Sequence, residues 1–222
     1  MEGIRLIFSD GKEDIMTDQK KVLEIIEKII RKIEEEKEYL TELDQPIGDS
    51  DHGINMARGF QEVEKKMPSL EGKDIGSVLK TVGMTLMSKV GGASGPLYGS
   101  AFMKAGMAMA GKTEMDIHDF LTCLDTAIAA VQKLGKAEVG EATMIDAMVP
   151  ADEAMKKALE SGADAKAVLE AGTKASWAGA EHTKELVATK GRASYVGERG
   201  IGHQDPGATS FSFILEVISE AV

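Results

Sequence analysis

Residues 44–53 read Asp-Gln-Pro-Ile-Gly-Asp-Ser-Asp-His-Gly, which places three carboxylates within eight residues. Pro46 and Gly48 end the helical segment before them, because neither residue suits a helix interior. Carboxylates this close repel one another, and a hard cation such as Mg²⁺ or Ca²⁺ removes the conflict because it takes oxygen ligands. The stretch therefore predicts a metal-binding loop between two helices.

On both sides of this loop, apolar residues recur at the i, i+3, i+4 spacing of amphipathic helices. The spacing predicts one helix over 18–43 and a second from near Gly53 to just before Pro68. Further helices are predicted over 74–89, 97–110, 116–134, 143–160 and 164–189, and a last one from Asp205, with Pro206 at its first position. Aromatic residues make up 5% of the chain, and no segment predicts a strand. The expected fold class is all-α, with eight helices.

The loops of this predicted bundle alternate in character. Those after the first, third, fifth and seventh helices carry the Gly, Asp and Ser residues. If consecutive helices run antiparallel, these four loops lie at one end of the bundle and form a functional rim. Residues 1–17 carry charge throughout and are expected to form a flexible leader, and residues 18–222 to form a single domain.

Composition narrows the class of partner. The net charge of −11 argues against nucleic acid, because phosphate contacts need clustered Lys and Arg. The sequence has no apolar run of membrane-spanning length and no signal-peptide core. Its lone cysteine, Cys123, suits a reducing compartment. We therefore expect a cytoplasmic protein, and a nucleotide remains a suitable ligand because a bound metal offsets its charge.

Each candidate motif also has a plainer interpretation. In the acidic loop, Asp49 or Asp51 could simply cap the next helix; the spacing is not that of an EF-hand and fits Mg²⁺ shared with substrate phosphates. Residues 91–96 form either a phosphate cradle or an ordinary turn in which Ser94 caps a helix. Arg192 either clamps a phosphate or forms a surface salt bridge. Spacing alone leaves these alternatives open.

Four stretches taken together resemble the signature of the ADP-binding L subunits of bacterial dihydroxyacetone kinases. These stretches are residues 43–56, 91–99, 135–137 and 191–210. The resemblance extends over residues 18–222 and implies a closed antiparallel barrel of eight helices with a nucleotide at one end. It also implies that Asp44, Asp49 and Asp51 coordinate two Mg²⁺ ions that bridge the phosphates of ADP or ATP.

The remaining nucleotide contacts that the resemblance implies come from the four Gly-rich loops. They are His52, Gly53, Ile54, Asn55, Ala93, Ser94, Gly135, Met144, Arg192, Asp205, Pro206 and Gly207. No residue is assigned as a general base, since phosphoryl transfer needs positioning and charge neutralisation more than proton transfer by the protein.

The resemblance further implies partner proteins. In the phosphoenolpyruvate-dependent branch, a phosphohistidine carrier (the M subunit) rephosphorylates bound ADP, and the γ-phosphoryl group passes to dihydroxyacetone held on the K subunit. The alternatives are a module that uses free ATP and a nucleotide-loaded sensor that binds a transcription regulator. Asp51-His52 argues against the related fatty-acid kinase module, whose acidic loop differs there. A homodimer and a short ketose other than dihydroxyacetone also stay open.

Overall fold

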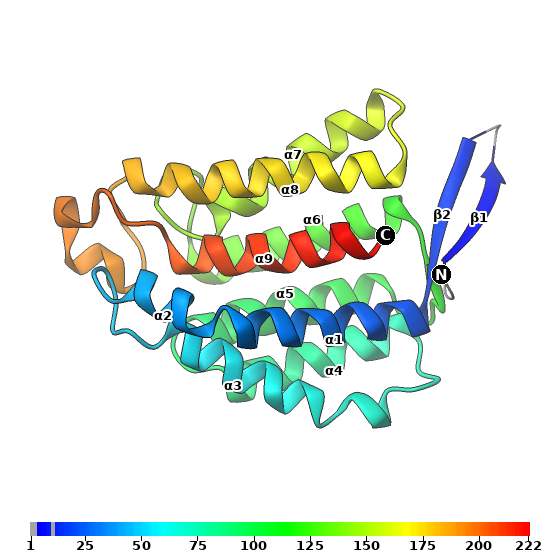
Figure 1. Ribbon diagram of the computed structural model, residues 1–222, viewed down its shortest axis with the longest axis horizontal. Coiled ribbons are helices and arrows are strands. Elements are labelled where there is room, and N and C mark those ends of the chain that lie inside the picture. Colours follow the sequence, from blue (N-terminus) through cyan, green and yellow to red (C-terminus); the bar gives the residue numbers. More distant parts are fainter. Residues whose placement is uncertain (1–3, 10–11) are drawn as a thin grey trace.

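The computed structural model describes residues 4–9 and 12–222, and most of these are helical (Figure 1). The helices in the described residues are α1 (Gln19–Glu35), α2 (Lys37–Asp44), α3 (His52–Glu64), α4 (Ile75–Lys89), α5 (Ser94–Ala108), α6 (Ile117–Gly135), α7 (Ile145–Glu160), α8 (Ala165–His182) and α9 (Pro206–Ala221). All eight predicted helices are present. The first of them is divided at Glu36 into α1 and α2, so the labels run to α9. The prediction of a mainly helical fold is thus confirmed.

Aspartate side chains begin several of these helices. Asp74, Asp116 and Asp205 each precede a helix and accept a hydrogen bond from the backbone N–H three residues on, at 3.0, 2.8 and 2.7 Å. These bonds satisfy amides that the helix itself leaves without partners. Because the caps are local, the three helix starts could be predicted to within a residue.

Several helix boundaries differ from the prediction, among them the end of α3, which lies at Glu64. Helix α5 begins at Ser94, three residues before the predicted start, because Pro96 falls in the first turn, where its missing N–H costs no helical bond. Helix α8 ends at His182, and the single turn Thr183–Glu185 follows it. The Gly-rich connection after it contains two further short turns, Arg192–Tyr195 and Gly197–Gly200.

Three strands in the described residues correct the expectation that no segment forms a strand. Strands β1 (Ile4–Ser9), β2 (Lys12–Asp18) and β3 (Glu114–Met115) form an antiparallel sheet in that order. The overlooked signal is Asp10-Gly11, a hairpin dipeptide between two β-prone runs. Residues 1–3 and 10–11 of the predicted leader lie outside the described residues. The division into a leader and one domain stays a prediction.

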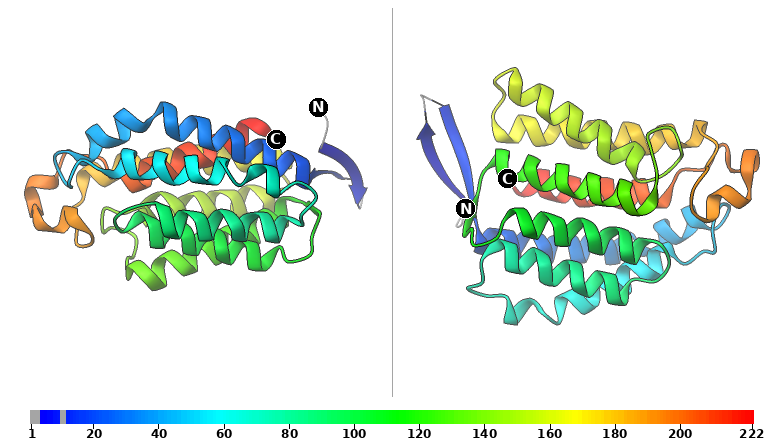
Figure 2. Two further views of the ribbon diagram at one scale, coloured as in Figure 1. Left: turned by 90° about the horizontal axis from the view of Figure 1, so that it is seen from below. Right: turned by 180° about the vertical axis from the view of Figure 1, so that it is seen from behind.

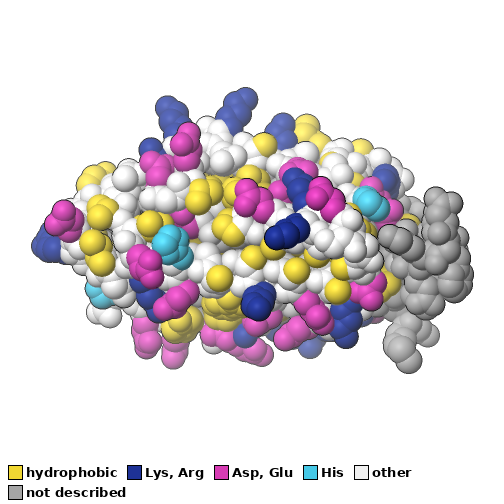
Figure 3. Space-filling view, turned by 90° about the horizontal axis from the view of Figure 1, so that it is seen from above, with side chains coloured by type: hydrophobic (Ala, Val, Ile, Leu, Met, Phe, Trp, Pro, Cys, Tyr) yellow, Lys and Arg dark blue, Asp and Glu magenta, His cyan; other side chains and the backbone are white. Residues whose placement is uncertain are grey.

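Helix α2 continues in the direction of α1, and from α3 on consecutive helices run antiparallel (Figures 1 and 2). The sheet lies at the end opposite the four Gly-rich loops. Each helix from α3 to α9 packs on its neighbours in the chain, and α1 packs on both α3 and α9. The closed form of the barrel stays a prediction. On the face shown in Figure 3, Lys and Arg lie interspersed with Asp and Glu, as expected for the solvent side of amphipathic helices.

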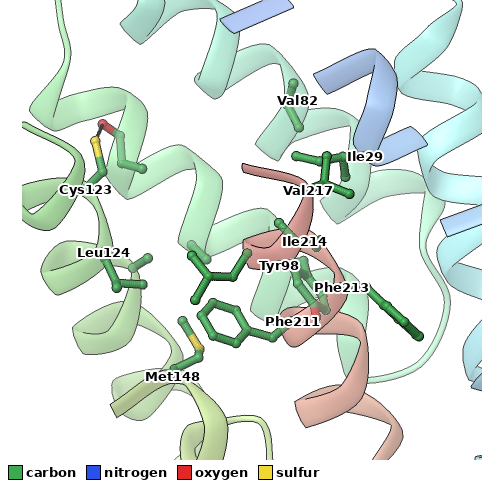
Figure 4. Close-up of a cluster of buried hydrophobic side chains, with 14 of the residues drawn as sticks. Ile29, Val82, Tyr98, Cys123, Leu124, Met148, Phe211, Phe213, Ile214 and Val217 are labelled. Carbon is green, nitrogen blue, oxygen red and sulfur yellow. Dashed lines mark hydrogen bonds between the residues drawn. The ribbon is translucent and has the colours of Figure 1, made fainter. Parts of the chain in front are cut away.

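The core lies along the axis of the bundle. The predicted stripe of α1, from Val22 to Ile33, is buried, and α9 is buried on nearly every side. Figure 4 shows Tyr98 of α5 beside Ile214 of α9, with Phe211 pointing toward Met148. An apolar cavity of about 190 Å³ lies among these side chains. In the part of the chain that the structure describes, no helix is long and apolar enough to cross a membrane.

Candidate nucleotide and metal site

A cleft of about 340 Å³ opens at the end of the bundle opposite the sheet. All four Gly-rich loops contribute to its walls, which confirms that they form one rim. Its lining includes Asp44, Ile47, Asp49, Asp51, His52, Asn55, Gly91, Gly92, Ala93, Ser94, Leu97, Tyr98, Leu134, Gly135, Thr143, Met144, Lys190, Arg192, Asp205, Pro206 and Gly207.

Four helices begin at this cleft. The first residues of α3, α5, α7 and α9 are His52, Ser94, Ile145 and Pro206, and all four line it. The N-terminal end of a helix carries a partial positive charge and backbone N–H groups without helical partners. The convergence of four such ends makes the cleft suited to an anion such as a phosphate chain.

Three carboxylates face this anion site. Asp44, Asp49 and Asp51 each offer an oxygen atom, and these oxygens all lie within 4.8 Å of one another. Asp44 is buried, and its Oδ2 accepts hydrogen bonds from the backbone N–H groups of Asp51 (2.9 Å) and His52 (3.2 Å). The side chain of Asp51 makes no capping bond. The plainer interpretation, in which Asp51 caps α3, is therefore wrong, because Asp44 supplies the acceptor across the loop.

The backbone of the acidic loop is shaped around this cluster. A Cβ atom at Gly48 would collide with the Asp44 carboxylate, so only glycine leaves room for it. Ser50 lies between the other two aspartates with φ at +59°, a left-handed conformation that costs a non-glycine residue about 1–2 kcal/mol. A strained backbone beside crowded like charges does not favour the folded state, which points to a ligand that compensates for both.

Arg192 lies across the mouth of the cleft from this loop. Its Nη2 is 2.8 Å from Oδ2 of Asp49, and the two side chains are 63% and 35% exposed. A salt bridge this exposed contributes little to stability, so either partner can exchange it for another ion. Arg192 thus forms the surface salt bridge of the plainer interpretation, but the partner of Arg192 is Asp49, a member of the carboxylate cluster.

Asn55 has its side-chain amide held by Arg58, one helical turn further along α3. Arg58 donates from Nη2 to Oδ1 of Asn55 (2.6 Å) and from Nε to the carbonyl of Lys89 (3.0 Å). Because the amide oxygen is thereby occupied, its NH₂ group remains to donate into the cleft that Asn55 lines. A Cβ atom at Gly91 would lie 2.6 Å from the same oxygen, so the Gly-rich loop gives the amide its space.

We predict that Arg58→Lys weakens binding of Mg·ADP by about 5-fold, within the range for one oriented hydrogen bond. Lysine keeps the charge but loses the planar fork that holds Asn55 and Lys89 at once. Calorimetric titration measures the change. Arg31→Lys, at an exposed position on α1, is the matched control and should bind as the wild type does. Unchanged affinity in Arg58→Lys would show that the amide of Asn55 needs no support.

His52 lies at the bottom of the cleft with both ring nitrogens bonded to hydroxyl groups. Its Nδ1 is 3.1 Å from Oγ of Ser94, and its Nε2 is 3.0 Å from Oγ of Ser210. Burial lowers the pKa of His52 to about 4, although the charge of Asp44 opposes this shift. The imidazole is therefore neutral at pH 7 and is a poor candidate for a charged phosphate clamp.

Asp205 begins α9 at the same end of the cleft. Loss of hydration there raises the pKa of its carboxyl to about 7, and the charges of Asp146 and Asp44 add to the effect. Its Oδ2 accepts the N–H of Ala208, which caps the helix and opposes the shift. A fourth carboxyl group beside the cluster, whose charged form is disfavoured there, again suits a site that holds a cation.

This shift gives Asp205 a predictable effect on stability. An ordinary Asp loses its proton near pH 3.8, whereas folded Asp205 keeps it to about pH 7. Between these values the folded protein holds a proton that the unfolded chain has lost, so the free energy of unfolding falls as the pH rises toward 7. In metal-free protein, we expect Asp205→Asn to avoid this fall while still capping α9.

The difference in Tm between Asp205→Asn and the wild type is expected to grow by about 2–4 °C between pH 5 and pH 8. A change of about 1 kcal/mol in the free energy of unfolding produces a shift of this size in a domain of this length. Thermal unfolding at the two pH values measures it. Asp164→Asn, which alters the exposed cap of α8, is the control and should show no such growth. A constant difference for Asp205→Asn would rule out the buried charge as its cause.

Nearly all the predicted site residues come together in this cleft. Asp44, Asp49, Asp51, His52, Asn55, Ala93, Ser94, Gly135, Met144, Arg192, Asp205, Pro206 and Gly207 all line it. Gly53 instead packs behind the loop, where a Cβ atom would meet the carbonyl of Lys37. Ile54 is 47% exposed and does not line the cleft. Whether each residue contacts a ligand stays a prediction.

Sequence reasoning missed three residues that hydrogen-bond to the predicted site residues or to one another beside the cleft. Arg58 follows Asn55 by three positions, Tyr98 follows Ser94 by four, and Ser210 follows Pro206 by four. Residues three or four apart lie on one face of a helix, so helical spacing from each predicted site residue was the available signal.

Comparison with known proteins agrees with this geometry. The family model described as the DAK2 domain matches residues 46–220. The PEP-dependent dihydroxyacetone kinase, ADP-binding subunit DhaL, of Escherichia coli is 45% identical over 84% of this chain and 89% of the relative. The PTS-dependent dihydroxyacetone kinase, ADP-binding subunit DhaL, of Lactococcus lactis is 48% identical over 90% of this chain and 96% of the relative.

A solved structure shares the fold. The dihydroxyacetone kinase from C. freundii in complex with AMP-PNP and Mg²⁺ superposes with a TM-score of 0.71 at 23% identity. The match covers 97% of this chain but 36% of that one, so this chain spans about a third of the kinase's length. Because the family model matches most of this chain, and because the two relatives are similar over most of their length, this chain belongs to the DAK2 domain family.

Proposed function

We propose that this protein is the nucleotide-carrying subunit of a phosphoenolpyruvate-dependent dihydroxyacetone kinase. Bound ADP would be rephosphorylated by a phosphohistidine carrier protein, and the γ-phosphoryl group would pass to dihydroxyacetone held on a partner subunit. The observation that carries the proposal is the cleft, in which three clustered carboxylates face four helix N-termini. The two relatives, named as ADP-binding subunits of such kinases, support the choice of ligand and reaction.

The residues present fit a metal–phosphate ligand. Asp44, Asp49 and Asp51 supply the hard oxygen donors that Mg²⁺ prefers, and we propose that they hold two Mg²⁺ ions. When bound, the ions would neutralise phosphate charge that the carboxylates would otherwise repel. The AMP-PNP and Mg²⁺ in the complex with C. freundii kinase are consistent with this ligand class.

The chain's own groups would position the nucleotide. Backbone N–H groups at the start of α5 and α9, together with the amide of Asn55, face the part of the cleft suited to phosphates. Leu97, Leu134 and Met144 add apolar side chains to its wall, next to Gly135, and this wall suits a planar base. With its pKa lowered to about 4 by burial, His52 is a weak base, and we assign no general base to a transfer that relies on positioning.

The proposal includes partner proteins and a cytoplasmic location. A K subunit would hold dihydroxyacetone and an M subunit would carry the phosphohistidine. A homodimer and a transcription regulator are further proposed partners. The open cleft, which faces away from the sheet end, supports access by another protein.

Nucleotide retention tests the proposal. The purified protein should carry ADP that survives dialysis in Mg²⁺, and its transfer activity with the partner subunits should require phosphoenolpyruvate and the carrier proteins. Transfer that proceeds with ATP alone, from nucleotide that exchanges freely, would instead favour the free-ATP kinase module. Absence of any nucleotide binding would overturn both assignments.

A further inference from the structure

A row of four hydrogen-bonded side chains connects the core to the cleft. Tyr98 Oη lies 2.7 Å from Oγ of Ser210, which lies 3.0 Å from Nε2 of His52, whose Nδ1 lies 3.1 Å from Oγ of Ser94. Three of these residues are buried, and Ser94, at the start of α5, is partly exposed to the cleft. We call this row the hydroxyl–histidine relay.

Each member of the relay has one hydrogen to donate when the imidazole is neutral. Two directions therefore satisfy the row. In the outward direction, Tyr98 donates to Ser210, Ser210 to Nε2 of His52, and Nδ1–H to Ser94, so the Ser94 hydrogen is free to point into the cleft. In the inward direction, Ser94 donates to Nδ1, Nε2–H donates to Ser210, and Ser210 donates to the carbonyl of Gly207, which is 3.1 Å away.

The contacts of Tyr98 and Ser210, together with an anion in the cleft, favour the outward direction. Tyr98 is 2.7 Å from Ser210 but 3.4 Å from the carbonyl of Gly207, so its proton has the better acceptor in Ser210. Tyr98 is 3% exposed and also lines the apolar cavity. Tyr98 thus donates to Ser210 and fills one of its acceptor positions, which disfavours a second hydrogen from Nε2–H of His52. The Ser210 hydrogen has two acceptors at similar distances, Nε2 of His52 (3.0 Å) and the carbonyl of Gly207 (3.1 Å). An anion that accepts from Ser94 at the outer end favours the first of these.

We propose that Tyr98 is a positioning residue for the phosphate end of the cleft, acting through Ser210 and His52 to direct the Ser94 hydroxyl hydrogen toward the bound anion. The inference rests on the proposed function, because it needs a phosphate in the cleft. It assigns His52 the Nδ1–H tautomer in the loaded protein. It also gives a share in the affinity to Ser210, which is outside the cleft lining, and to Tyr98, which lines the cleft and whose hydroxyl is bonded to Ser210.

The test is ¹⁵N NMR of histidine-labelled protein, with calorimetric titration of Mg·ADP on the same samples. In the loaded wild type, His52 should show a protonated Nδ1 and an unprotonated Nε2. Tyr98→Phe and Ser210→Ala should each lower the Nδ1–H population and raise the Kd of Mg·ADP by about 2- to 10-fold, the range for one net hydrogen bond.

Ser212→Ala is the matched control, because Ser212 is a buried serine of α9 that donates to the carbonyl of Ala208, outside the relay. It should keep both the wild-type tautomer and the wild-type affinity. If Tyr98→Phe does not fold, Ser210→Ala tests the same relay.

Three results would overturn the relay: an Nε2–H tautomer in the loaded wild type, wild-type affinity in both relay variants, or weaker binding with an unchanged tautomer. Failure of the wild type to bind Mg·ADP would overturn the proposed function along with it, whereas binding with the wrong tautomer overturns the relay alone.

Discussion

The Asp51→Asn variant is expected to lose Mg²⁺-dependent binding of ADP, with the Kd rising by more than about 100-fold. Mutating groups that merely support metal ligands costs about 10- to 100-fold in metal affinity, and a direct ligand should cost more. Asp51 is the best member of the cluster to change, because its side chain makes no capping bond. Changing Asp44 would also remove the acceptor for two backbone amides at the start of α3.

The sign of the effect should reverse when the metal is removed. With a chelator present, the carboxylates only repel the phosphates, so Asp51→Asn should bind ADP slightly better than the wild type does. A change that damages the loop would weaken binding under both conditions. The reversal therefore distinguishes loss of a metal ligand from loss of structure.

Titrations of ADP with Mg²⁺ and with a chelator make the measurement. Glu42→Gln is the control, because it makes the same charge change at an exposed position two residues before Asp44. It should leave the Mg²⁺-dependent affinity within about 2-fold of the wild type, as expected for a solvated charge. Wild-type affinity of Asp51→Asn in Mg²⁺ would show that the cluster does not hold the metal.

The features that the sequence predicted well are those set by local chemistry. The acidic loop could be located from residues 44–53 alone. Proline and glycine indicate a turn, and crowded carboxylates indicate a cation site, in each case from neighbours a few positions away. The helix starts at Asp74, Asp116 and Asp205 follow from side chains that bond three residues ahead. The single rim followed from the alternation of loop types along an antiparallel bundle.

The features that were missed depend on residues far apart in the chain. The contact between His52 and Ser210 spans 158 positions, and the salt bridge of Arg192 with Asp49 joins the last Gly-rich loop to the first. No spacing rule reaches across such separations. The role of Asp44 as an acceptor for the start of α3 was missed for a different reason, because capping rules look only at the residue just before the helix.

Arg192→Ala is expected to separate metal binding from phosphoryl transfer. The Arg192 guanidinium is 2.8 Å from Asp49. A metal that takes up the Asp49 carboxylate competes with that ion pair, so loss of the arginine should leave Mg²⁺ affinity unchanged or slightly higher. We propose that the guanidinium, once released from Asp49, holds charge that develops on the transferring group. Removing one such donor lowers kcat by about 100- to 1,000-fold in enzymes with preorganised sites.

Transfer to dihydroxyacetone with the partner subunits gives kcat, and a titration of Mg²⁺ into the isolated protein gives the metal affinity. Arg199→Ala removes an exposed guanidinium seven residues further along the same connection and should leave both quantities unchanged. A normal kcat in Arg192→Ala would reduce its contact with Asp49 to a surface salt bridge. Lower Mg²⁺ affinity in that variant would instead mean that the arginine organises the acidic loop, because removing a competing cation can only favour the metal.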